Sequence, residues 1–147
     1  MIDLSALSGK NVAVVCVGNP LCSDDGFGPA VAARLQGKAV FDAGSVPENV
    51  LPQVARGEPD IVLFVDAGEF GAGPGTLRLV SPEELAQGSY GTHSASLDVA
   101  AEYLRQACRA QSMLLVAQPK SLALGGVMSV EMIRAVAEAA GLLREVV

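Results

Sequence analysis

The sequence has no tryptophan, only one histidine and only three cysteines among its 147 residues. The cysteine count is odd and no two cysteines form a CxxC pair, so neither a disulfide framework nor a zinc-binding cysteine cluster is expected. No apolar run reaches the roughly 18 residues that a membrane span requires, and no charged segment followed by an apolar run opens the chain. These absences predict a cytoplasmic protein with no membrane partner.

Basic residues are also scarce. Ten lysines and arginines face sixteen aspartates and glutamates, which gives a net charge of −6. An acidic chain repels phosphate backbones, so nucleic acid is not an expected partner. The glycine-rich segments GNPLCSDDGFG and AGEFGAGPG lack the GKS or GKT ending of a phosphate-binding loop, and their carboxylates would repel a nucleotide.

Short apolar runs alternate with amphipathic segments, which is the pattern of a mostly parallel sheet covered by helices. Strands are predicted at 12–17, 39–43, 60–66, 76–80 and 112–117, and helices at 29–36, 48–56, 95–108 and 130–140. Ser129 is the expected cap of the last helix, and Gly141 its stop signal. We therefore expect one domain over residues 1–147. Its fold class is α/β, a three-layer α/β/α domain with a five-stranded, mostly parallel, twisted sheet and one antiparallel edge strand.

Acidic residues follow two of these strands at the edge where such sheets bind ligands. That edge lies beyond the carboxyl ends of the strands, at the point where the first and third strands are neighbours. Asp24 and Asp25 follow the first strand, and Asp66 ends the third in DIVLFVD. His93 precedes the helix at 95–108. Together these side chains form a mixed oxygen and nitrogen ligand set, which suits a borderline divalent ion such as Ni²⁺ or Zn²⁺.

Each of these residues also has an ordinary structural interpretation. Asp24 or Asp25 is typical of a helix cap, and Asp66 of a residue that braces a glycine-rich loop. A lone histidine before a helix is typical of a capping or surface group. Cys22 is open to two interpretations, a nucleophile beside His93 or a side chain packed in its loop. The residues alone do not decide between a metal or catalytic site and a set of purely structural groups, so both interpretations stay open.

The most specific pattern in the sequence is a series of five segments. In order they are GNPLCSDDGFGPAVAARL, GSVPENV, DIVLFVDAGEFG, THSASL and QPKSLALGGVMS. Together they resemble the maturation endopeptidases of nickel-iron hydrogenases, over nearly the whole chain from about Val12 to Ser129. PEN and QPKS are most similar to the branch of that family that serves hydrogenase-3-like and methanogen-type hydrogenases.

The resemblance implies an enzyme that cuts a short carboxyl-terminal extension from the precursor of a hydrogenase large subunit after nickel insertion. The nickel-recognising ligands of the family are an acidic residue after the first strand, an aspartate after the third and a histidine before the following helix. By motif position these fall on Asp25, Asp66 and His93. Some members have glutamate at the first position, so the carboxylate of Asp25 reaches one methylene less far.

Two mechanisms fit this resemblance. In the first, a metal ion bound by the three ligands polarises the scissile carbonyl and activates water. In the second, the nickel ion belongs to the substrate, and the three side chains bind it to recognise a loaded precursor before the chain is cut. In the second case Asp24 either braces the turn or is the catalytic base beside Asp25. Nickel is expected to come from the precursor, with zinc or cadmium as surrogate ions, and the protein is expected to be a monomer. Gly26 and Gly28 would leave room for the substrate backbone, and the loop at 67–75 would move to admit it.

Two other classes of protein remain as alternatives. A non-enzymatic chaperone that binds nickel or the precursor tail would use the same three ligands and leave the precursor uncut. A small-molecule hydrolase or nucleoside-phosphorylase-like enzyme would share the three-layer fold, although fold likeness alone is a weak reason to assign a function. The sequence has no HExxH motif, so a zinc protease of that kind is not expected.

Overall fold

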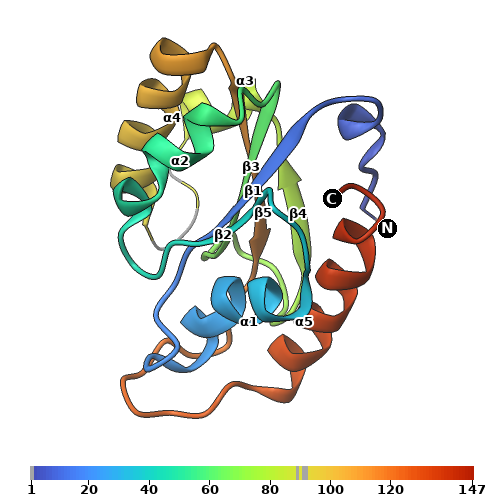
Figure 1. Ribbon diagram of the computed structural model, residues 1–147. Helices are drawn as coiled ribbons and strands as arrows, with labels where there is room; N and C mark the ends of the chain where they lie inside the picture. Colours follow the sequence, from blue (N-terminus) through green and yellow to red (C-terminus); the bar gives the residue numbers. More distant parts are fainter. Residues whose placement is uncertain (1, 89, 91–92) are drawn as a thin grey trace.

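The computed structural model describes residues 2–88, 90 and 93–147 (Figure 1). Its strands are β1 (Val12–Cys16), β2 (Val40–Asp42), β3 (Ile61–Ala67), β4 (Leu77–Val80) and β5 (Gln111–Ala117). They form one sheet in the order β2-β1-β3-β5-β4. All neighbouring strands are parallel except β4, which runs antiparallel to β5 at the sheet edge. The predicted strands, the antiparallel edge strand and the α/β fold class are confirmed.

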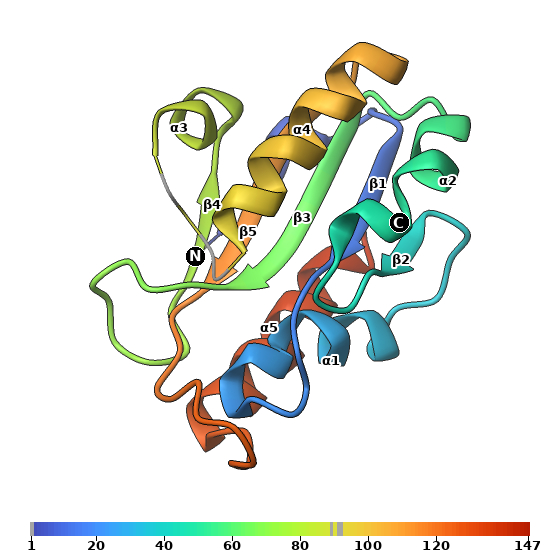
Figure 2. The ribbon, with the colours of Figure 1, turned by 90° about the vertical axis from the view of Figure 1, so that its left-hand side faces the viewer.

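Helices cover both faces of the sheet (Figures 1 and 2). One face carries α1 (Phe27–Arg34) and α5 (Val130–Leu143), and the other carries α2 (Leu51–Arg56) and α4 (Ser94–Cys108). The remaining helices are α3 (Pro82–Gln87), which follows β4, and the short 3₁₀ helices η1 (Ser5–Leu7), η2 (Ser23–Gly26) and η3 (Pro47–Asn49). None of the helices within the described ranges is long and apolar enough to cross a membrane.

The two faces of the sheet bury two separate apolar layers. Val14 and Leu63 pack in the layer beneath α1 and α5, whereas Val15 and Phe64 pack in the layer beneath α2 and α4. All four side chains are fully buried. Since successive strand residues point to opposite faces, both alternating sets must be apolar, which explains the continuous apolar runs in the sequence.

All four predicted helices are present, but several of their ends differ from the prediction; α2, for example, begins at Leu51 after the short η3, not at residue 48. α1 begins at Phe27, two residues early, and Pro29 lies in its first turn, where the missing N–H breaks no helical hydrogen bond. The predicted stop at Gly141 is wrong, because α5 continues to Leu143. Leu143 is fully buried, so its packing holds the helix past the glycine, which costs only about 1 kcal/mol inside a helix.

α3 was not predicted, although the sequence carries a signal for it. Ser81 accepts a hydrogen bond from the Glu84 N–H at 3.1 Å, and the Glu84 carboxylate accepts one from the Ser81 N–H at 3.2 Å. This reciprocal pair is a capping box, which stabilises the first turn of a helix. The serine three residues before a glutamate was therefore readable as a helix start.

Candidate functional site

β1 and β3 lie side by side in the middle of the sheet, with Cys16 opposite Val65 near their carboxyl ends. The chain leaves β1 toward β2 on one side, whereas β3 pairs with β5 on the other side. The strand order therefore reverses between β1 and β3, as predicted. In open α/β sheets this crevice is where ligands bind.

Asp25, Asp66 and His93 come together at this edge. Each offers one ligand atom, and these atoms all lie within 4.8 Å of one another. Asp66 is fully buried, Asp25 is 7% exposed and the His93 side chain is 17% exposed. Neither Asp24 nor Cys22 belongs to the group. The structure thus brings together the three residues predicted as ligands, while their role as nickel ligands stays a prediction.

Asp66 and His93 make direct contacts. The Asp66 carboxylate accepts a hydrogen bond from the His93 backbone N–H, with N and Oδ2 3.2 Å apart. The imidazole Nδ1 lies 3.3 Å from both carboxylate oxygens. The hydrogen bond to Asp66 is the main cause that raises the pKa of His93; burial opposes it, and the charges of Asp66 and Asp25 add to it. A metal ion that binds the imidazole must therefore compete with a proton held by this pair.

Asp25 reaches the site because the chain turns sharply after β1. Gly18 has a φ of +154°, and a Cβ built on it would lie 2.1 Å from the carbonyl oxygen of Asp25. Only glycine allows this approach, since any side chain would collide with the backbone. The Asp25 Oδ2 accepts a hydrogen bond from the Asn19 N–H at 3.0 Å. The turn and its hydrogen bond hold this carboxylate above the end of the strand.

Gly28 packs α1 directly onto the ends of the central strands. A Cβ at this position would lie 2.2 Å from the Val17 carbonyl oxygen and 2.8 Å from that of Val65. At Gly26 a Cβ would lie 3.2 Å from the Cα of Pro20. The hypothesis that a glycine leaves room here for another polypeptide is therefore wrong for Gly28, because the chain itself occupies that space; for Gly26, which lines an open groove, it stays a prediction.

The Asp24 carboxylate holds a different part of the chain. Oδ1 accepts a hydrogen bond from the Ser129 N–H at 2.7 Å, and Oδ2 accepts one from the Ser129 hydroxyl at 2.8 Å and one from the Lys120 N–H at 2.8 Å. The Ser121 N–H lies 3.5 Å from Oδ2. Asp24 is 1% exposed, so these donors replace water around a buried charge. Its bracing partners are the loop and cap before α5, and its predicted role as a catalytic base stays a prediction.

Gln118, which the sequence did not single out as a site residue, lies at the carboxyl edge of the sheet. It is 3% exposed and follows β5. Its Oε1 accepts hydrogen bonds from the Phe70 N–H at 2.8 Å and the Ala72 N–H at 3.3 Å, and its Nε2 donates to Glu69 at 2.6 Å. The side chain thereby fastens the glycine-rich loop that follows Asp66. The signal in the sequence was an amide directly after an apolar strand. It could not identify the partners of Gln118, because they lie nearly fifty residues away in the sequence.

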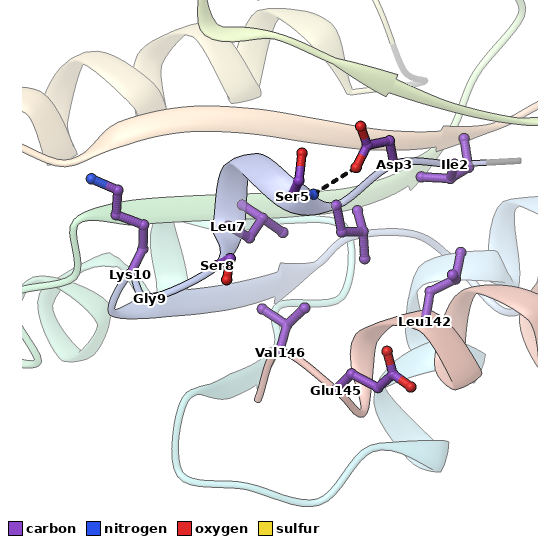
Figure 3. A pocket seen from close by; sticks show the side chains of 11 residues that line it. Ile2, Asp3, Ser5, Leu7, Ser8, Gly9, Lys10, Leu142, Glu145 and Val146 are labelled. Atoms are coloured by element: carbon purple, nitrogen blue, oxygen red, sulfur yellow. Dashed lines mark hydrogen bonds between the residues drawn. The ribbon is translucent and has the colours of Figure 1, made fainter.

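A separate cavity lies beside the other end of β1 (Figure 3). It has a volume of about 400 Å³, and its lining includes Leu7, Lys10 and Val146. At its rim Asp3 accepts a hydrogen bond from the Ser5 N–H at 2.9 Å. Because Lys10 precedes β1, this cavity lies at the amino end of the strand, whereas the three candidate ligands lie at the carboxyl ends.

A family model described as hydrogenase maturation protease matches residues 30–146. The chain belongs to the hydrogenase maturation protease family. It is similar to the hydrogenase 3 maturation protease of Escherichia coli, with 35% identity over 79 residues, which cover 50% of this chain and 51% of the relative. It is also similar to a putative hydrogenase maturation protease of Methanocaldococcus jannaschii, with 23% identity over 76% of this chain and 73% of that protein. The predicted family is confirmed, and this chain spans about half the length of the first curated relatives it matches.

Solved structures have the same fold. The crystal structure of the maturation protease HycI from Thermococcus kodakarensis superimposes with a TM-score of 0.83 at 28% identity, covering 95% of this chain and 94% of that one. The solution structure of the endopeptidase HycI from Escherichia coli gives a TM-score of 0.78 at 26% identity, covering 92% and 90%. The agreement extends over nearly the full length of both chains.

Proposed function

We propose that this chain is an endopeptidase that removes the carboxyl-terminal extension from the large-subunit precursor of a nickel-iron hydrogenase after nickel has been inserted. The observation that carries the proposal is the group of Asp25, Asp66 and His93, whose ligand atoms lie within 4.8 Å at the switch point of the sheet. Membership of the hydrogenase maturation protease family supplies the class of reaction. The precursor is the partner, and the nickel ion arrives as part of the substrate.

The donor set suits that task. Two carboxylates and one imidazole match the ligand preferences of a borderline divalent ion, and zinc or cadmium would serve as surrogates. Three protein ligands leave other coordination positions for groups of the precursor. The chain then binds the precursor productively only when an ion is present in it. This arrangement links cutting to completed nickel insertion without a metal ion that belongs to the protease.

The two neighbouring aspartates take different roles in this proposal. The ligand atom of Asp25 lies within 4.8 Å of those of Asp66 and His93, which supports a role for Asp25 in binding the ion and in acting on water near the scissile bond. Asp24 accepts hydrogen bonds from Ser129 and Lys120, which use most of its capacity to accept. We therefore propose that the main role of Asp24 is to position Asp25. The catalytic role predicted for Asp24 is the less favoured alternative.

The second candidate is a non-enzymatic chaperone that binds nickel or the precursor tail. It is retained because the three side chains account for metal binding but do not by themselves account for attack on a peptide bond. Both candidates act on the same precursor. We also propose a cytoplasmic location, which agrees with three cysteines that are all unpaired, and a monomeric state.

The deciding experiment is mass spectrometry of the large-subunit precursor after incubation with this chain. Nickel-loaded and nickel-free precursor are compared, and Asp25→Ala is the inactive control. Loss of a carboxyl-terminal peptide from the loaded form alone supports the protease and its dependence on nickel. If both forms keep their mass while the folded chain binds the loaded precursor, the chaperone is the better assignment. Cutting of both forms would show that cutting does not depend on nickel in the precursor.

A further inference from the structure

Apolar side chains project into solvent on the loop between β5 and α5. Val127 is 89% exposed, Leu124 is 79% exposed and Leu122 is 41% exposed. Leu21, which is 67% exposed, lies on the loop after β1 that leads to Asp25. These four residues, Leu21, Leu122, Leu124 and Val127, are called the apolar patch below. Large apolar patches exposed on soluble proteins mark contact sites.

The two loops that carry the apolar patch are joined by hydrogen bonds. The Gly125 N–H donates to the Leu21 carbonyl at 2.8 Å, and the Ser23 hydroxyl donates to the Ala123 carbonyl at 2.7 Å. A Cβ at Gly126 would lie 2.2 Å from the Ser23 hydroxyl oxygen, so the loops are in close contact there. They lie side by side at the same end of the molecule in both views (Figures 1 and 2). The apolar patch is therefore carried by two loops that are held together, although they come from distant parts of the chain.

This surface carries no exposed charge. The segment 121–129 contains no charged residue, and the only charged residues at 17–29 are Asp24 and Asp25, which are both buried. The nearest basic side chain in the sequence, Lys120, forms an ion pair with Glu131 at 3.2 Å. An uncharged apolar area on a chain of net charge −6 fits an apolar protein surface better than a nucleic acid or a charged small molecule.

The apolar patch is linked to the loop that carries Asp25. Asp24 anchors its loop through Ser129 and Lys120, and the next residue is Asp25. Beside it runs an open groove of about 520 Å³, whose lining includes Pro20, Gly26, Val127 and Met128. An ion that is held by a folded substrate and reaches Asp25 must bring the substrate surface around that ion against the same end of the protease.

We infer that the apolar patch docks an apolar surface of the folded body of the large-subunit precursor, next to the nickel ion. This inference rests on the proposed function and adds the contact that selects the precursor. The candidate ligands recognise the nickel ion, while the apolar patch recognises the protein that carries the ion. The patch and the ligands together let the chain discriminate a loaded precursor from other nickel proteins.

The test compares Leu124→Asp and Val127→Asp with Val99→Asp. Val99 is a matched control because it is 61% exposed on α4, on the opposite face of the sheet. Binding of purified nickel-loaded precursor is measured by biolayer interferometry, and cutting by steady-state kinetics. A charge placed in the centre of a docking surface is expected to raise both Kd and KM about tenfold or more and to leave kcat within about twofold. Val99→Asp is expected to behave as the wild-type chain.

Three results would overturn the inference. One is an unchanged Kd for the precursor in both patch variants. Another is weaker binding of a synthetic carboxyl-terminal tail peptide by the patch variants, in proportion to the precursor, because the occupant would then be the tail. The third is a wild-type dimer in sedimentation velocity that Val127→Asp dissociates, which would make the patch an interface between copies of this chain. If the wild-type chain binds the precursor but never cuts it, the protease proposal fails. The Kd values of the patch variants and of Val99→Asp still show whether the apolar patch docks the precursor.

Discussion

The hydroxyl of Ser129 donates a hydrogen bond to Asp24 at 2.8 Å and accepts one from the Met132 N–H at 3.1 Å. The same group thus caps α5 and holds the buried carboxylate that precedes Asp25. The first turn of the last helix and the turn after the first strand are fixed to each other in this way. The candidate site therefore depends on contacts made far from its ligands in the sequence.

Asp24→Asn is expected to lower the free energy of unfolding by about 2–3 kcal/mol, because bonds to a buried charge are lost and an amide N–H₂ then faces donors. Urea denaturation measures the change. Asp98→Asn, at an exposed position on α4, removes the same charge without such bonds and serves as the control. An Asp24→Asn protein of wild-type stability with no proteolytic activity would instead assign Asp24 a catalytic role.

Asp25→Ala and His93→Ala are each expected to abolish processing of the precursor, since each removes one of the three candidate ligands. Asp25→Glu is expected to keep part of the activity because it retains a carboxylate, one methylene further out. Circular dichroism and thermal melting check that the variants fold, and the mass of the precursor reports cutting. Normal processing by both alanine variants would show that the site is elsewhere.

The metal-free chain is expected to show a pH-dependent contribution from His93. Its hydrogen bond to Asp66 raises the pKa of the imidazole, so the folded chain binds the proton more tightly than the unfolded chain. The contribution to stability is full below the ordinary histidine pKa of about 6.5 and is lost as the pH rises through the higher folded pKa. Urea denaturation is expected to show that the difference in free energy of unfolding between the wild type and His93→Ala becomes smaller as the pH rises through this window.

The same window is accessible by NMR, because His93 is the only histidine in the chain and its ring signals need no further assignment. The ring is expected to titrate above the ordinary histidine value in the absence of metal. A midpoint below that value would mean that burial, which opposes the charged form, outweighs the pairing with Asp66.

Gly28→Ala is expected to lower the free energy of unfolding by about 3 kcal/mol, because its Cβ would overlap the backbone of two central strands. Gly141→Ala is the matched control. It lies inside α5, and no atom lies within 4 Å of a Cβ built there, so this variant is expected to gain about 0.5–1 kcal/mol. Thermal or urea unfolding of the two variants is compared, and similar effects of the same sign would contradict the packing described at Gly28.

That Asp24 or Asp25 would lie near Asp66 and His93 was predictable from the sequence for a topological reason, whereas the choice of Asp25 over Asp24 rested on the resemblance to the hydrogenase maturation endopeptidases. Apolar runs located the strands, and adjacent parallel strands end at the same edge of a sheet. The predicted strand neighbours needed only the usual right-handed crossover. The positions of these acidic residues after the first and third strands then indicated that they lie at one edge of the sheet, without knowledge of any side-chain contact.

The contacts of Asp24 and Gln118 were not predictable in the same way. Asp24 bonds to Ser129, 105 positions further along the chain, and Gln118 to Phe70, 48 positions back. Neither pairing leaves a periodic pattern, since it depends on how two loops meet after the sheet has formed. Gly28 was misread for the same reason, because the sequence shows that a side chain is missing but not which atoms fill the space.

The three candidate ligands come from the turn after β1, the end of β3 and the start of α4, and an entire strand crossover separates the first two. An unfolded or partly synthesised chain consequently has no high-affinity place for an ion, because its donors are scattered. Under the proposed function, recognition of the nickel ion therefore begins only when the chain has folded, and a partly synthesised chain does not compete for nickel.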